Sequence, residues 1–246
     1  MHQPLCFFRN PGWLMVLVLA IFAYKPVSAQ ADFVFTASGG TGSNAVDAQA
    51  DFSLNGNTLT IVLTNLQPGM ISAGQAISGL EFMVTPPGGD ITSSNATLES
   101  VTGNVVSVSG GKTTPLGVGP TTYSGSTLSD SQWDVSSSAG LTALTGGKPN
   151  HLILDGDTSG FNSSVNQHTP DFQSSATFVL TVKGMNSNST ISGVIFDFGT
   201  SPETSLPGTL VPNSAPAPPS IVLLGVGGLC LAGFLVVSRR RMASAA

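Results

Sequence analysis

Apolar side chains recur at every second position through much of residues 31–200. Near the start of this region, Leu59, Ile61 and Leu63 share one face of an extended chain, and threonines occupy the other face. A period of two is typical of a β-strand with one buried face. Four other segments alternate in the same way: Phe33 and Phe35; Leu80, Phe82 and Val84; Phe178, Leu180 and Val182; Val194, Phe196 and Phe198. The pattern predicts an all-β fold.

Turn residues separate these alternating segments. Residues 48–54 alternate like residues 58–64, and the intervening Asn55-Gly56-Asn57 tolerates positive φ, so the two segments predict a β-hairpin. No stretch sustains the period of an amphipathic helix. We therefore predict an antiparallel β-sandwich of the immunoglobulin-like or jelly-roll type over residues 30–200. Residues 110–148, rich in Gly, Ser and Thr, are expected to form long loops or short edge strands.

The first 29 residues have the pattern of a secretory signal. Arg9 precedes a short apolar core at Leu14–Ala23, and small residues follow up to Ala29. This arrangement predicts a signal peptide over residues 1–29, cleaved after Ala29 or after Ala31. A retained membrane helix is the alternative.

Prolines dominate residues 201–219. Six prolines lie in this segment, which favours an extended polyproline conformation and disfavours pairing in a sheet. We predict a linker that reaches up to roughly 60 Å at about 3.1 Å per residue.

An uncharged apolar run follows the linker. Ile221 to Val237 comprises 17 residues without a charge, about 25 Å as a helix, against a hydrocarbon core of about 30 Å. The run predicts one short transmembrane helix over residues 221–237. Arg239, Arg240 and Arg241 follow directly and favour a cytoplasmic location for that end, which leaves the body of the chain outside.

The order of these C-terminal features resembles a known family. Pro216-Ala217-Pro218, the apolar run and the three arginines resemble the PEP-CTERM sorting signal of exosortase-dependent bacterial surface proteins, with Ala217 where the family usually has Glu. The strand-like residues 56–65 and 192–200 also resemble segments of PEP-CTERM ectodomains. The resemblance covers residues 216–241 of the tail and implies processing by an exosortase-like enzyme at the membrane. An ordinary single-span anchor that is never processed is the alternative.

Charge and cysteine content exclude several function classes for the body. Residues 31–219 carry 3 lysines and 13 acidic residues, a net charge of 3 − 13 = −10, which disfavours nucleic acid as a partner. Both cysteines, Cys6 and Cys230, lie in the two terminal segments. The body therefore contains no disulfide, and thiol chemistry is excluded there.

One acidic segment has part of the spacing of a calcium loop. Asp155, Asp157 and Ser159 place oxygens at the first, third and fifth positions, and Gly160 stands at the sixth. The twelfth position is Asn166, where an EF-hand has Glu. We therefore keep two interpretations: a calcium site, the only cofactor considered, and an acidic turn that follows a strand.

Trp133 is the candidate for carbohydrate binding. It is the only Trp of the body, and Tyr123 is the only Tyr. An exposed indole could stack on a sugar ring of an extracellular polysaccharide, whereas a buried one would pack between sheets.

Catalysis has few candidate residues. His151 and His168 lie near Asp155, Asp157 and Asp171 in the sequence, but no nucleophile elbow, metalloprotease motif or phosphate-binding loop is present. We expect no enzymatic activity. The sequence favours an exported, non-enzymatic surface or extracellular-matrix protein, membrane-anchored at least transiently; the alternative is a carbohydrate-binding or calcium-dependent adhesion module.

Overall fold

A computed structural model describes most of the body of the chain. The described residues are 31–40, 45–87, 96–138, 141–146, 150–157, 159–200 and 204–212. They belong to one compact unit, Gln30–Asn213. The predicted signal peptide 1–29, the sorting signal 216–241 and the transmembrane helix 221–237 lie outside them. No helix within the described ranges has the length and apolarity needed to cross a membrane.

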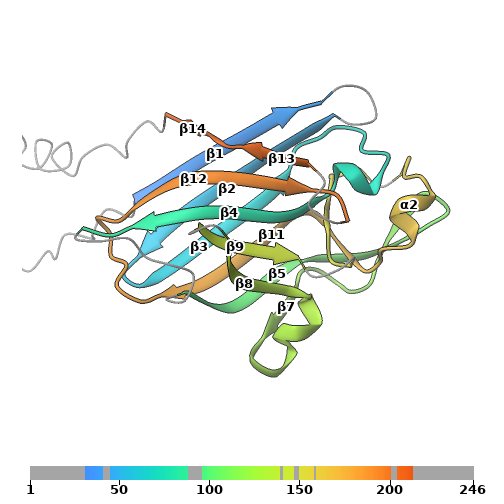
Figure 1. The fold of residues 1–246 in the computed structure, drawn as a ribbon. Helices are drawn as coiled ribbons and strands as arrows, with labels where there is room; N and C mark the ends of the chain where they lie inside the picture. Colours follow the sequence, from blue (N-terminus) through green and yellow to red (C-terminus); the bar gives the residue numbers. More distant parts are fainter. Residues whose placement is uncertain are drawn as a thin grey trace, which may run out of the picture. The chain divides into compact units, whose positions relative to one another are not determined.

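The predicted all-β class is confirmed (Figure 1). The strands are β1 (Ala31–Gly39), β2 (Val46–Asn55), β3 (Thr58–Asn65), β4 (Ile77–Thr85), β5 (Ala96–Ser109), β6 (Lys112–Pro115), β7 (Thr121–Ser124), β8 (Trp133–Ser138), β9 (Leu141–Gly146), β10 (Ile153–Leu154), β11 (Asp171–Val182), β12 (Thr190–Phe198), β13 (Thr204–Pro207) and β14 (Thr209–Val211). The described helices are short: η2 (Ala73–Gln75), η4 (Gly125–Ser131) and α2 (Ser163–Asn166).

The predicted hairpin is formed by β2 and β3. Buried and partly buried residues alternate along both strands, so the apolar face of each strand enters the core while the threonines of β3 face outward. The turn between them uses Gly56 at a φ of +60°, a conformation that costs glycine little. Sequence alternation thus fixes both the pairing and the face that is buried.

All described strands belong to one sheet. Its main order is β13-β12-β4-β10-β11-β3-β2-β1-β14, and β5 to β9 attach to β11 and β4. Only Gly208 separates β13 from β14 along the chain, so the first and last strands of this order are covalently adjacent. Among the described pairs, β10 with β11 is parallel and the others are antiparallel.

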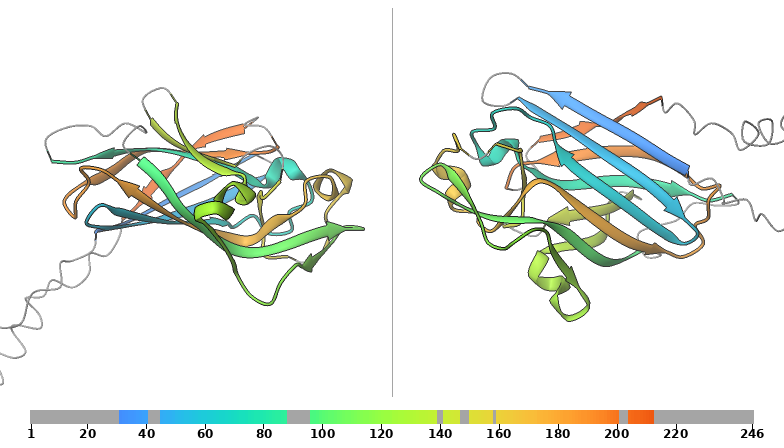
Figure 2. Two further views of the ribbon diagram at one scale, coloured as in Figure 1. Left: turned by 90° about the horizontal axis from the view of Figure 1, so that it is seen from below. Right: turned by 180° about the vertical axis from the view of Figure 1, so that it is seen from behind.

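The sheet folds around a core of aliphatic and aromatic side chains. Phe52 on β2 packs edge to face against Phe82 on β4, with ring centroids 5.3 Å apart. Trp133 on β8 packs against Phe178 on β11 at 4.7 Å. These pairs join strands that are not neighbours in the sheet, and the views in Figure 2 show the sheet curling over itself. Full burial of each such ring contributes about 1.5–3 kcal/mol.

A second buried cluster lies at the end of the molecule that carries η2 and α2 (Figure 1). Met70, Phe161 and Val165 are buried in it. A backbone hydrogen bond joins the β3–β4 connection to the β10–β11 connection at this end: Asn162 N–H donates to the carbonyl of Ile71 at 2.7 Å. This end positions the candidate site described below.

The linker prediction is wrong for residues 204–211. These residues form β13, which pairs with β12, and β14, which pairs with β1. Prolines do not prevent this pairing because Pro207 is the last residue of β13 and Pro212 follows β14. Between the strands, Gly208 N–H donates to the carbonyl of Val194 at 2.8 Å. The folded domain therefore extends beyond the predicted boundary at residue 200.

Candidate functional site

Asp155 and Asp157 hold a turn in place. After β10, the Asp155 carboxylate accepts hydrogen bonds from the N–H of Met70 at 2.8 Å and of Asp157 at 3.2 Å. The Asp157 carboxylate accepts from Gly69 N–H at 2.9 Å. Asp155 is only 2% exposed, and desolvation by burial is the main cause that raises its pKa. The two carboxylates thus join the β10–β11 connection to the β3–β4 connection.

Ser159, the third candidate ligand, is exposed and forms an isolated β-bridge with Lys112. Within the described ranges, no three His, Cys, Asp or Glu side chains come together as a metal-binding group. The hydrogen bonds that the structure shows for the Asp155 and Asp157 carboxylates are those of a turn that follows a strand.

Trp133 lies in the core. Its side chain is 3% exposed, and its Nε1–H donates to the carbonyl of His151 at 2.9 Å. The buried interpretation is confirmed, and the predicted stacking role is wrong because neither face of the indole is open to a ligand. The sequence could not decide this, since the apolar neighbours that bury Trp133, such as Phe178, are distant along the chain.

His151 is a buried part of the same region. Its backbone has a φ of +62°, and its ring lies at 5.5 Å from the ring of Tyr123, with 3.3 Å between Nε2 and the tyrosine hydroxyl. Its Nδ1 is buried without a hydrogen-bond partner. Desolvation lowers the pKa of His151, so the ring is neutral at pH 7.

Asp171 is a buried carboxyl at the start of β11. Its Oδ1 accepts a hydrogen bond from Leu152 N–H at 3.1 Å, while its Oδ2 has no partner. Burial raises the pKa of Asp171 to about 8, so the carboxyl is largely protonated at pH 7. Neither His151 nor His168 hydrogen-bonds to this carboxyl, and Nδ1 of His168 is also buried without a partner. The histidines and carboxylates considered for catalysis are therefore not joined into a triad.

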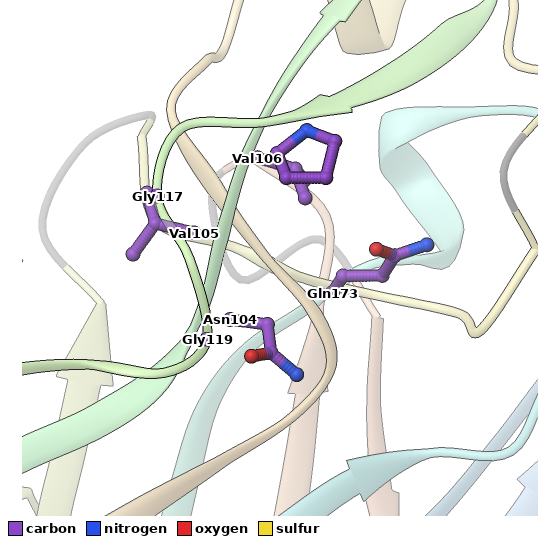
Figure 3. Close-up of a pocket in the computed structure, with 7 residues that line it drawn as sticks. Asn104, Val105, Val106, Gly117, Gly119 and Gln173 are labelled. Carbon is purple, nitrogen blue, oxygen red and sulfur yellow. The ribbon is translucent and has the colours of Figure 1, made fainter.

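A small surface pocket lies beside this region (Figure 3). Its volume is about 180 Å³. Asn104 on β5 and Gln173 on β11 are register partners, and both contribute side-chain amides. The β6–β7 connection, residues 116–120, passes over the same part of β5. The lining residues are Asn104, Val105, Val106, Pro115, Gly117, Gly119 and Gln173.

An irregularity of β11 shapes this pocket. Between the pairs Gln173–Asn104 and Ala176–Gly103, β11 contains two additional residues. One of them, Ser174, has a φ of +69°, which is uncommon for a residue other than glycine. A Cβ on Gly103 would lie 2.6 Å from Cδ1 of the Phe172 ring, so this close packing requires glycine. β-Bulges and strained residues of this kind concentrate near functional sites, where they redirect side chains.

The two amides differ in how they are held. Gln173 Nε2 donates to the carbonyls of Asp157 at 3.2 Å and Gly156 at 3.4 Å, which orients the amide. The Asn104 side chain has no hydrogen-bond partner among the described residues and is exposed. Sequence reasoning missed both residues because lone amides carry no motif. The available signal was the apolar Leu116 and Val118 within a Gly-, Ser- and Thr-rich stretch.

No family model matches the chain, and no curated protein is significantly similar to it. Its function is therefore inferred from its own residues.

Proposed function

We propose that this chain is an exported, non-enzymatic surface or extracellular-matrix protein that carries an exosortase-type sorting signal. The observation that carries the proposal is the order of three elements at the C-terminus. Pro216-Ala217-Pro218 precedes the apolar residues 221–237, and three arginines follow at residues 239–241. The apolar run anchors the chain in the membrane, at least transiently, and an exosortase-like enzyme is the processing partner.

We propose that the folded domain that precedes this signal is a β-sandwich of the immunoglobulin-like or jelly-roll type. Support comes from the contacts between Phe52 and Phe82 and between Trp133 and Phe178, which join strands that are not neighbours in the sheet. Facing sheets bury such side chains between them. Residues 213–219 then remain as the linker to the membrane segment.

A non-enzymatic role is supported by the positions of the candidate catalytic groups. His151 is buried with Tyr123 as its hydrogen-bond partner, and Asp171 is buried with a backbone amide as its partner. The negative charge of the body supports partners other than nucleic acid. We do not extend the proposal to calcium-dependent adhesion: the Asp155 and Asp157 carboxylates accept hydrogen bonds from backbone amides.

The test is an intact-mass measurement of the native protein from the cell envelope and from the medium. A mass that ends between Pro216 and Ser220, with or without an added group, supports the sorting signal. A variant with serine at residues 239–241 is the matched control, and its tail should remain unprocessed. A wild-type mass that includes Ala246 in every fraction would refute processing and leave a plain membrane anchor.

A further inference from the structure

The pocket at Asn104 and Gln173 has a neutral lining on a strongly acidic domain. None of the seven lining residues carries a charge. An ionic ligand would need a charged partner to replace its lost hydration, and these residues offer none. The lining therefore selects a ligand whose polar groups are uncharged.

The polar side of the pocket suits hydroxyl groups. Because Gln173 Nε2 is bonded to two backbone carbonyls, its Oε1 is left as an oriented acceptor. Asn104 is without an internal partner among the described residues and offers both donors and an acceptor. A hydroxyl group can donate to one amide and accept from the other, so two amides on paired strands match neighbouring hydroxyls of one ring.

The other side of the pocket is apolar. Val105 and Pro115 line it, and Gly117 and Gly119 of the overlying loop complete the lining. Figure 3 shows Asn104 beside Gly119 of this loop. A sugar ring combines hydroxyl edges with a C–H face, which is the combination that this lining can bind. The volume, about 180 Å³, is below the roughly 300–1,000 Å³ of sites for drug-sized ligands and suits a single ring.

Short hydroxyl side chains continue from the pocket along the sheet. Thr102 and Thr122 on β5 and β7 lie with their hydroxyls 2.9 Å apart, and Thr177 on β11 is the register partner of Thr102. β-Branched side chains have few rotamers, so little conformational entropy is lost when they contact a ligand. A polymer with one ring in the pocket could extend across these threonines.

We propose that this pocket binds one sugar residue of a neutral polysaccharide, with the adjacent threonines contacting the next residues of the polymer. This inference deepens the proposed matrix function and rests on it, because the proposed location outside the cell is where the protein would encounter the polysaccharide. Asn104 and Gln173 bind ring hydroxyls, and Val105 and Pro115 contact the apolar face.

The experiment measures mobility of the full mature chain in native gels that contain a neutral glucan, a galactomannan or the polyanion alginate. We expect retardation by at least one neutral polymer and none by alginate. Asn104→Ala should weaken the binding about tenfold, because it removes amide hydrogen bonds without disturbing an internal one. Gly117→Asp, which places a charge in the pocket lining at a position with room for a side chain, should weaken it as well. Gln49→Ala, an amide on β2 outside the pocket, is the matched control and should bind normally.

Three results would overturn the inference: no retardation by any neutral polymer, equal retardation of wild type and Asn104→Ala, or retardation by alginate alone. Fluorescence of Trp133 reports whether each variant is folded. The result of this binding experiment is independent of the intact-mass measurement that tests processing of the tail. A processed tail without polysaccharide binding refutes this inference alone, and an unprocessed tail with binding at Asn104 refutes the sorting signal alone.

Discussion

Replacing Asp171 with asparagine should change how the stability of the domain depends on pH. The carboxyl is fully buried, one oxygen accepts from Leu152 N–H, and its pKa is raised to about 8. In the unfolded chain the pKa returns to about 4. The folded state therefore holds the proton more tightly, and the free energy of unfolding falls as pH rises from about 4 to about 8.

The magnitude follows from the difference between the two pKa values. About four pH units at about 1.36 kcal/mol each give on the order of 5 kcal/mol, lost between pH 4 and pH 8 and constant above that range. The carboxamide of the Asp171→Asn variant resembles the protonated carboxyl in shape and does not titrate. This variant should therefore be more stable than wild type at pH 8, with a difference that shrinks by several kcal/mol toward pH 5.

Urea denaturation followed by Trp133 fluorescence at pH 5, 6, 7 and 8 measures this difference. The difference between the two proteins is used because His151 also titrates. Burial lowers the pKa of His151, so its contribution makes the free energy of unfolding rise with pH below about 6.5, the ordinary pKa of histidine. This contribution is common to both proteins and cancels in the difference. Asp134→Asn, an exposed carboxyl on β8, controls for the loss of one negative charge. A difference between Asp171→Asn and wild type that stays constant over this range would refute the reasoning.

Four further substitutions test the fold and the site by urea denaturation. Phe52→Ala should lower the free energy of unfolding by about 3–5 kcal/mol, and a loss below about 1 kcal/mol would contradict its central place in the core. Gly103→Ala should cost about 1–3 kcal/mol, since its Cβ would lie 2.6 Å from a buried ring; unchanged stability would show that the bulge is not tightly packed. Asp155→Ala should cost about 1–3 kcal/mol, more than Asp157→Ala, because it leaves a buried amide of the β3–β4 connection unpaired. Equal losses for these two variants would argue against that hydrogen bond.

Local pattern was enough to predict the strands. The alternation at Leu59, Ile61 and Leu63 and the turn at Gly56 are short-range signals, and the β2–β3 hairpin follows them. Of the two alternatives given for residues 110–148, long loops or short edge strands, short strands are present as β6 to β9, and β9 pairs on both sides. In such segments the side-chain period and the turn chemistry agree, so little depends on the rest of the chain.

Long-range contacts decided the features that the sequence did not predict. The prolines of residues 201–219 argue against pairing when the segment is considered alone, yet β12 and β1 supply partners for residues 204–211. The candidate site depends on the same kind of information. Asn104 and Gln173 meet only because β5 pairs with β11 across the bulge at Ser174, and no spacing in the sequence records that register.

Under the anchoring proposed above, residues 204–211 would have a mechanical role in tethering the domain. Tension from an anchored tail would reach β14 first, where the backbone pairing to β1 would bear the load, and then β13 on β12. A cut upstream of Thr204 would detach both strands and uncover two sheet edges, which are templates for aggregation. A cut beyond Val211 leaves both edges covered. The cleavage proposed above, between Pro216 and Ser220, lies downstream of β14 and would therefore release the domain with both edges covered.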